Sequence, residues 1–73
     1  MKLVIITPRE SSTFNGVSSV TLPGSEGRFT VLRHHAPLIA AIKQGVLHYD
    51  RNEIPIHGGV VEVNNNMITV ITE

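Results

Sequence analysis

Four histidines are the most chemically versatile residues of this chain, because imidazole binds metal ions and acts as a general base. His34 and His35 are adjacent, and adjacent residues of a strand point to opposite faces, so these two side chains do not share one ion. His48 and His57 fall diagonally on the outer face of a predicted hairpin, within reach of Glu53. No defined ligand spacing links them, so a solvated polar face explains them better than a metal site, and we assign none.

Serine hydroxyls are the second group that could do chemistry, as nucleophiles. None of the five serines that we considered lies in a nucleophile elbow or in a spacing that pairs it with a histidine base; they are Ser11, Ser12, Ser18, Ser19 and Ser25. The segment Gly-Ser-Glu-Gly at 24–27 lacks the Gly-Lys-Ser/Thr ending of a phosphate loop, and no predicted helix follows it. The sequence therefore predicts no catalytic residue and no cofactor site.

Composition narrows the class of protein further. The chain has 73 residues, enough for one domain, and it has no cysteine, so hydrophobic packing must stabilise the fold. Six Lys and Arg balance six Asp and Glu, and the only aromatic residues are Phe14, Phe29 and Tyr49, which fit apolar patterns; this argues against nucleic-acid binding. The apolar runs at 3–6 and 36–42 are shorter than the roughly 20 residues of a membrane span, and we expect a soluble, intracellular protein.

Short strands separated by turn signals must position these side chains. Residues 2–7 alternate β-branched side chains between two faces and predict a first strand, which Pro8 ends. A polar turn over 10–13 and the turn pair Asn15-Gly16 come next, followed by a strand over 17–22. Phe29 with Val31 and the run 38–42 predict further strands; Ala40-Ala41 alone also fits a helix, but the short length favours a strand.

The segment 46–57 predicts a hairpin. Pairing Tyr49 with Ile54 and Leu47 with Ile56 places four apolar side chains on one face. Pro55 has no amide hydrogen, so it needs a position that does not donate to the partner strand. We therefore predict a four-residue loop over 50–53.

A second hairpin is predicted after the corner at Gly58-Gly59. Residues 60–64 pair with 67–71 through Asn65-Asn66, because Asn suits the positive φ angles of a type I′ turn. In this register Val61 faces Val70, Val63 faces Ile68 and Glu62 faces Thr69. Many short strands and no convincing helix predict an all-β fold, a flattened sandwich of two packed, mostly antiparallel sheets or a flattened barrel.

The run from 22 to 37 is the most distinctive segment of the chain. Pro23 is expected to set the second position of a turn, while Gly24 and Gly27 supply positive φ or close backbone approach. Ser25, Glu26 and Arg28 are then presented at the tip of the loop. From these residues alone, the sequence predicts a small β interaction domain without an active site.

These residues resemble the epsilon subunit of bacterial F-type ATP synthases over essentially the whole chain. The matching positions are Leu22, Pro23, Gly24, Ser25, Glu26, Gly27, Val31, Leu32, His35, Ala36, Pro37, Lys43, Gly45, Gly58, Gly59, Glu62 and Val63, with the segments 64–66 and 69–73. The resemblance implies a β-sandwich that docks on the gamma subunit and on the polar loops of the membrane c-ring. It also implies a non-catalytic rotor subunit that couples proton- or sodium-driven rotation to ATP synthesis at distant subunits.

The resemblance suggests two sets of contact residues. Ser25, Glu26, Gly27 and Arg28 are the candidates for the c-ring contact, and the candidates for the gamma contact are Arg33, His34, His35 and Leu38. It further implies no cofactor, no direct nucleotide binding and a peripheral location at the cytoplasmic face of the bacterial inner membrane. The alternative from another class is a free-standing β-barrel that binds a small ligand or a protein, which would need a concave apolar pocket.

This sequence departs from the family pattern at several positions. Arg28 stands where relatives often carry an acidic or small polar residue, and Arg33-His34 stands where Pro followed by Asn or Gly is common; His34 is among the residues enriched at positive φ. Val60 follows the double glycine where a larger residue is often found. The family's two-helix hairpin would begin near Glu73, so we expect residues 1–73 to form a single sandwich domain without that hairpin.

Overall fold

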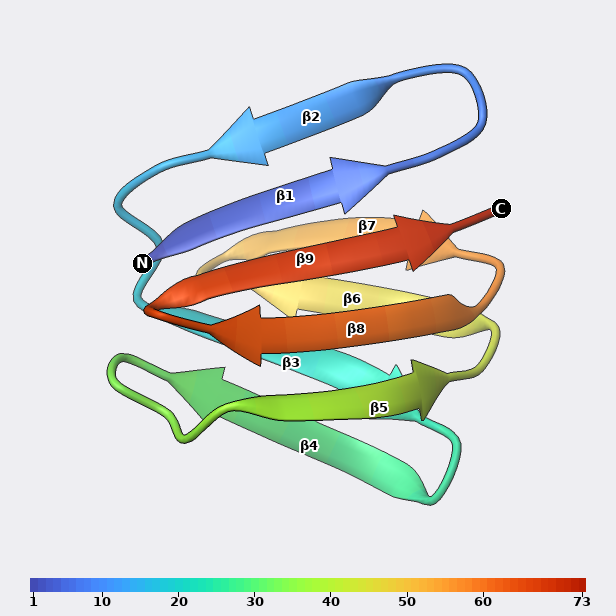
Figure 1. Ribbon diagram of the computed structural model, residues 1–73. Helices are drawn as coiled ribbons and strands as arrows, with labels where there is room; N and C mark the ends of the chain where they lie inside the picture. The colour runs from blue at the N-terminus through green and yellow to red at the C-terminus, as the bar shows by residue number, and fades with distance from the viewer.

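Nine strands make up the computed structural model, which describes residues 1–73 and contains no helix (Figure 1). In chain order the strands are β1 (Lys2–Ile6), β2 (Ser11–Phe14), β3 (Ser19–Gly24), β4 (Gly27–Leu32), β5 (Leu38–Ile42), β6 (Gly45–Tyr49), β7 (Asn52–Ile56), β8 (Gly59–Asn64) and β9 (Met67–Thr72). All pairings are antiparallel except β1 with β9. The predicted all-β, mostly antiparallel fold is confirmed.

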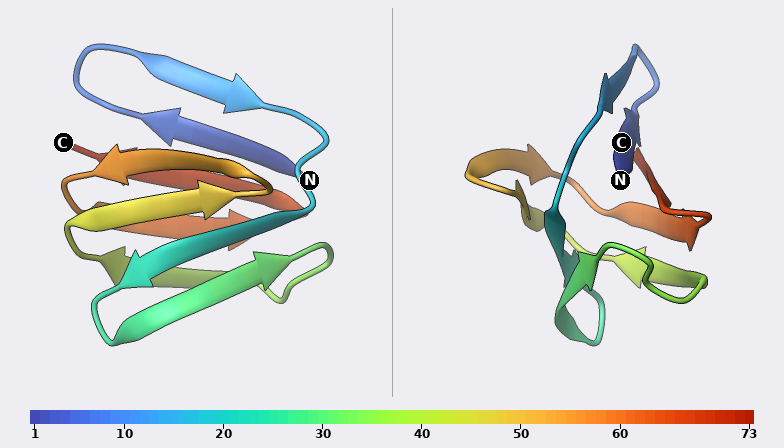
Figure 2. Two further views of the ribbon diagram at one scale, coloured as in Figure 1. Left: turned by 180° about the vertical axis from the view of Figure 1, so that it is seen from behind. Right: turned by 90° about the vertical axis from the view of Figure 1, so that its left-hand side faces the viewer.

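The strands form two layers that are joined into one curled sheet. One layer has the order β2-β1-β9-β8-β5, and the other has β4-β3-β6-β7. The views from behind and from the side show the second layer covering the first (Figure 2). A single pair, Gly24 with Ile42, connects the layers where β5 leaves the edge of β3. The sandwich is therefore continuous at this corner.

The core lies between the layers and follows the two-residue period of the strands. Thirteen apolar residues are buried there: Leu3, Ile5, Val17, Val20, Leu22, Val31, Ile42, Leu47, Ile56, Val61, Val63, Ile68 and Val70. Phe14, Phe29 and Tyr49 are half-buried and pack against this cluster, as the sequence predicts for core aromatics. The Phe14 and Tyr49 rings lie 4.7 Å apart and bring the first layer against the second.

The hairpin β8–β9 has the predicted register, with Val61 opposite Val70 and Val63 opposite Ile68. Asn65 and Asn66 form its turn with φ angles of 51° and 60°, as a type I′ turn requires. His34 also takes a positive φ, 63°, as expected for its loop. At these positions the residue type, Asn or His, predicts the positive φ angle.

The hairpin β6–β7 corrects the predicted register. Leu47 pairs with Ile54 and Tyr49 with Asn52, so the loop is Asp50-Arg51 and not the four residues 50–53. Counting from this closing pair, Pro55 lies opposite Val46 at a non-hydrogen-bonded position. The shifted two-residue loop therefore places Pro55 where no amide hydrogen is needed, and a wider loop is not required. The shift moves the pairing by two residues, which keeps the predicted apolar face intact.

Two further expectations near the N-terminal half were wrong, and one predicted strand has shifted bounds. The predicted polar turn over 10–13 is instead strand β2, which pairs with β1 from Leu3 to Ile6. The strand predicted over 17–22 begins at Ser19 and continues to Gly24. Pro23 thus lies inside a strand and not in a turn; its carbonyl accepts a hydrogen bond from the Lys43 amide at 2.8 Å, where β3 passes from β6 to β5.

Candidate functional site

The β3–β4 turn presents the first set of predicted contact residues. Gly24 pairs with Gly27, so Ser25 and Glu26 form the tip and are exposed. A Cβ atom at Gly24 would lie 2.6 Å from the Gly27 carbonyl oxygen and 2.9 Å from the Phe29 ring, which excludes any larger residue. The Ser25 amide donates to the Ala41 carbonyl at 3.0 Å and ties the turn to β5. The turn is therefore held in place from both sides.

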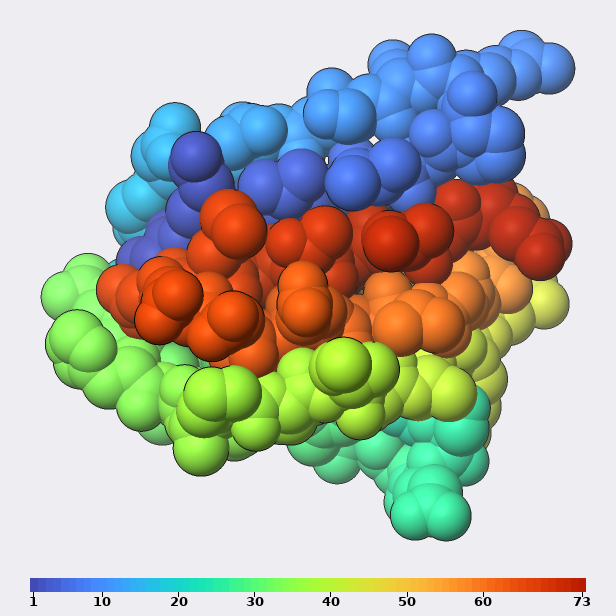
Figure 3. Space-filling view, in the orientation of Figure 1, coloured from blue at the N-terminus to red at the C-terminus, as the bar shows by residue number.

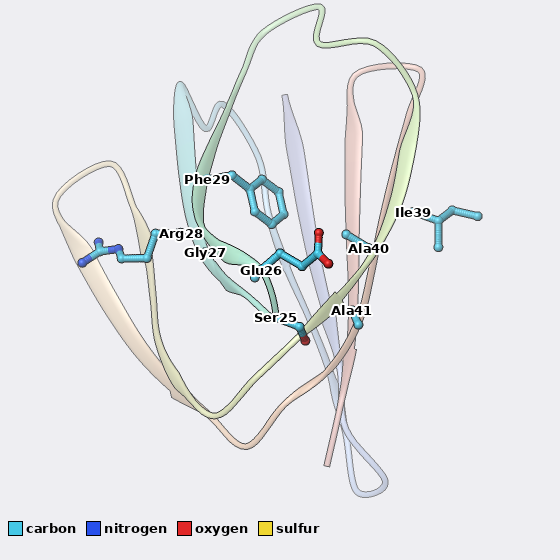
Figure 4. Close-up of a pocket in the computed structure, with 9 residues that line it drawn as sticks. Ser25, Glu26, Gly27, Arg28, Phe29, Ile39, Ala40 and Ala41 are labelled. Carbon is cyan, nitrogen blue, oxygen red and sulfur yellow. The ribbon is translucent and has the colours of Figure 1, made fainter.

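The charged side chains of this turn point in different directions. The Glu26 side chain extends toward Ala40 and Ala41 of β5, whereas Arg28 extends away from them (Figure 4). Both residues are exposed. The structure brings the four predicted residues 25–28 together, but Arg28 lies in β4 opposite Pro23 and not at the tip as expected, and the two charges are separated onto two sides of the turn.

A surface cleft adjoins this turn, between the edges of β4 and β5. It has a volume of about 620 Å³ and is lined by residues 24–29 and 39–41. The Phe29 ring points into it and is half-buried (Figure 4). No local sequence signal predicts this cleft, because it arises where β5 diverges from β3 after their single pair.

The β4–β5 loop presents the second set of predicted contact residues. The His34 amide donates to the Asn66 side-chain oxygen at 3.1 Å, and the His35 amide donates to the Leu32 carbonyl at 3.2 Å. The His35 Nδ1 lies 2.6 Å from the Ala36 carbonyl oxygen, so this nitrogen carries the hydrogen. The loop is held by the chain and leaves Arg33, His34 and His35 exposed.

The two sets lie at opposite ends of strand β4. The six residues of β4 separate them by roughly 20 Å at about 3.3 Å per residue. The β3–β4 turn and the β4–β5 loop project from opposite ends of the domain (Figure 1). One rigid strand thus connects both candidate contact regions.

Asp50 was missed by sequence reasoning, although it organises the same end of the domain as the β4–β5 loop. Its carboxylate accepts hydrogen bonds from the Ser18 and Ser19 amides at 3.0 and 3.1 Å. The Arg33 guanidinium donates to the Ser18 hydroxyl at 3.4 Å, so the loops at this end are connected. The sequence shows that Asp50 lies near a turn, but it does not show that the β2–β3 loop supplies the amides that its carboxylate accepts from.

An exposed apolar row crosses the outer face of the first layer. Ala41 pairs with Val60, Val60 with Ile71, and Ile71 with Ile6 across four strands. Val60 is 45% exposed and Ile71 is 55% exposed. Ile39, the most exposed large apolar residue at 74%, lies on the same face two residues from Ala41. The space-filling view shows this face of β5, β8 and β9 toward the viewer (Figure 3).

The residues considered for catalysis or metal binding are dispersed. His48 pairs with Glu53 on the hairpin, while His57 lies beyond the end of β7. No three His, Asp or Glu side chains are grouped so that they could hold a metal ion. No helix of the chain has the length and apolar character of a membrane span.

Comparison with known proteins identifies a family whose sequence pattern matches this chain. The family described as ATP synthase, Delta/Epsilon chain, beta-sandwich domain matches residues 1–73. The ATP synthase epsilon chain of Chlorobium limicola is 39% identical over 77 residues, which cover 99% of this chain and 88% of that protein. The epsilon chains of Leptospira interrogans and Nitratiruptor sp. are 35% and 42% identical, with all of this chain matched. The chain spans 61% and 60% of the length of these two relatives.

A solved structure has the same fold. It is the cryo-EM structure of the central stalk and c-ring of the Tetrahymena thermophila mitochondrial ATP synthase, with a TM-score of 0.82 and 18% sequence identity. The match covers 97% of this chain and 61% of that one. At this identity the likeness concerns the fold.

Proposed function

This chain belongs to the family of ATP synthase delta/epsilon chain β-sandwich domains, and on that premise we propose that it is a non-catalytic subunit of the central stalk of an F-type ATP synthase. In this proposal it docks on the gamma subunit and on the c-ring, and it turns with them. It thereby couples proton- or sodium-driven rotation to ATP synthesis at other subunits. Its location is then peripheral, at the cytoplasmic face of a bacterial inner membrane.

The placement of the two candidate contact regions carries this proposal. A coupling subunit must touch two partners and keep a fixed distance between them, and β4 has a candidate region at each end. Ser25, Glu26, Gly27 and Arg28 would meet the polar loops of the c-ring. Arg33, His34, His35 and Leu38 would meet gamma, together with the adjoining apolar face that begins at Ile39. These assignments make the domain a spacer between the two partners.

The construction of the domain suits this mechanical role. Thirty-five of its 42 backbone hydrogen bonds lie within the strands, and the single Gly24–Ile42 pair joins the layers into one sheet. A load at one end of β4 is therefore resisted by a continuous ladder and by a close-packed core. The proposal assigns the domain no catalytic step, no cofactor and no nucleotide.

The alternative of a small-ligand β-barrel has no comparable support. The space between the layers is filled by the thirteen buried apolar side chains. Both hollows of the surface lie along strand edges, near Ser25 and near Pro37. No observation favours this alternative over the stalk subunit.

Co-purification with the gamma subunit of the same organism tests the proposal. We expect the chain to form a stable complex with gamma, and we expect His35→Ala to weaken it because it truncates an exposed side chain of the candidate contact. Leu38 is half-buried and packs against the core, so its substitution would disturb the fold as well as the contact. His57→Ala, at an exposed site outside both candidate regions, is the matched control and should bind like the parent chain. A parent chain that does not associate with gamma at micromolar concentration contradicts the proposal.

A further inference from the structure

The outer edge of β5 has backbone groups without a partner strand. β5 pairs with β8 along its length, but on its other side only Ile42 pairs, with Gly24. Counting from the closing pair Asn64–Met67, the alternation of antiparallel ladders directs the backbone of Ile39 and Ala41 away from β8. The hydrogen bond from the Ser25 amide to the Ala41 carbonyl agrees with this direction. No backbone hydrogen bond outside the strands reaches Ile39.

The other free edges are guarded, whereas β5 is not. Natural proteins protect edge strands with charged residues, proline or short length, because an open edge pairs with foreign strands. β7 carries Glu53 and Pro55, β4 carries Arg28, and β2 has only four residues. The five residues of β5 are Leu-Ile-Ala-Ala-Ile, without a charge or a proline. An edge of this composition is suited to being covered by another strand.

The cleft beside this edge gives such a strand a place. It lies between β4 and β5, its volume is about 620 Å³, and the Phe29 ring forms an apolar wall in it. Ala40 and Ala41 have small side chains, so they leave the edge accessible. The Glu26 carboxylate extends over the same cleft and favours a positive charge there (Figure 4).

We propose that an extended segment of the gamma subunit adds to β5 as a further strand in this cleft. The inference rests on the proposed function for the identity of the partner. The added strand receives the N–H and C=O groups of Ile39 and the N–H group of Ala41. Its side chains alternate, so that an apolar one meets Phe29 and a Lys or Arg meets Glu26. In this arrangement Glu26 faces gamma, and the c-ring contact is left to Ser25, Gly27 and Arg28 on the other side of the turn. The cleft runs from Ile39, the neighbour of Leu38 in the candidate gamma contact, toward the β3–β4 turn.

Proline substitution removes one outward amide hydrogen and leaves the strand ladders intact, which makes it a sharp test. In Ile39→Pro the lost donor is the one that faces the cleft, because Ile39 does not bond to β8 in this register. In Glu53→Pro the lost donor faces solvent on the outer edge of β7, and this variant is the matched control. Thr30→Pro removes the corresponding donor from β4 and tests whether the strand adds on the opposite wall of the cleft.

Titration calorimetry with purified gamma gives the dissociation constant of each variant. We expect Ile39→Pro to weaken binding about tenfold or more and the other two to stay within about twofold of the parent. A parent-like affinity of Ile39→Pro, with the parent binding gamma, overturns strand addition and leaves the proposed function standing. A loss in Thr30→Pro but not in Ile39→Pro also overturns the choice of β5. If the parent chain does not bind gamma, both strand addition and the proposed function are wrong.

Amide hydrogen exchange of the parent chain covers the case in which Ile39→Pro does not fold. We expect gamma to slow exchange at the Ile39 amide at least about tenfold and to leave Thr30 unchanged. Unchanged exchange at Ile39 in the complex contradicts the proposal. Slowing at Ile39 without gamma, together with dimerisation of the chain, would mean that a second copy covers the edge, and this too contradicts it.

Discussion

The side chains of Glu26 and Arg28, two residues apart at the β3–β4 turn, point in opposite directions (Figure 4). Glu26 extends over the cleft beside β5, and Arg28 extends to the other side of β4. The two opposite charges therefore face different surroundings and can meet different partners. This separation makes the two charges independently testable.

Arg28 is predicted to meet an acidic or neutral position of the c-ring loop, because like charges at an interface are costly. Arg28→Glu should weaken assembly with the c-ring, and changing the facing acid of the loop to Lys should restore it. Arg51→Glu, at the exposed β6–β7 turn, is the control with the same charge change. If Arg28 is only solvated, it contributes about 0 to 1 kcal/mol and Arg28→Glu assembles like the parent at low salt, which contradicts the prediction.

The Asn65-Asn66 turn is predicted to stabilise the chain in two ways that can be separated. Both residues have positive φ, which Ala tolerates poorly, but only Asn66 also accepts a hydrogen bond from the His34 amide. Asn65→Ala should lower the free energy of unfolding by about 1 kcal/mol and Asn66→Ala by about 2 kcal/mol. Urea denaturation measures both values. Equal losses would show that the bond to His34 adds nothing.

Asp50 is predicted to tie the β2–β3 loop to the β6–β7 turn through its carboxylate. Asp50→Gly suits the positive φ of 51° but removes the acceptor for the Ser18 and Ser19 amides, so it should cost about 1 to 2 kcal/mol of stability. Asp50→Asn keeps an acceptor oxygen and should cost less than about 1 kcal/mol. The order of the two unfolding midpoints is the readout, and a reversed order argues against this bond.

Gly59 is predicted to be irreplaceable at the corner before β8. Its φ is 145°, and a Cβ atom there would collide with the carbonyl oxygen of Ile71 on β9. Gly59→Ala should therefore destabilise the fold by at least about 3 kcal/mol. Gly16→Ala has positive φ but open space around the Cβ atom, so it should cost only about 1 to 2 kcal/mol. Similar thermal midpoints of the two variants would contradict the steric argument.

The sequence predicts local features of this fold better than distant ones. The β8–β9 register follows from Asn65-Asn66, because both turn positions need positive φ. The β6–β7 register was missed because the same apolar face forms when the pairing shifts by two residues, and the positive φ of Asp50 that marks the observed turn was not recognised. The parallel pairing of β1 with β9 joins the two ends of the chain and has no local signal.

In the candidate site, too, local features were predicted from the sequence and features that depend on distant segments were not. Gly24 and Gly27 predict a tight turn that exposes Ser25 and Glu26, and the structure contains that turn. Strand β2 and the cleft depend on pairing that has no apolar signal in the sequence: β2 is polar and is held by β1, and the cleft opens because β5 diverges from β3 beyond their single pair. The open edge of β5 is therefore visible only in three dimensions.

Coupling in reconstituted vesicles is the most direct test of the proposed role in the stalk. The measurement compares ATP-driven ion pumping per ATP hydrolysed in ATP synthase assembled without this chain and after its addition. We expect that the chain binds and raises this ratio, and that the exposed-site variant His35→Ala raises it less than the parent chain does. A ratio that does not change although the chain is bound to the enzyme would contradict its role as a coupling subunit of the stalk.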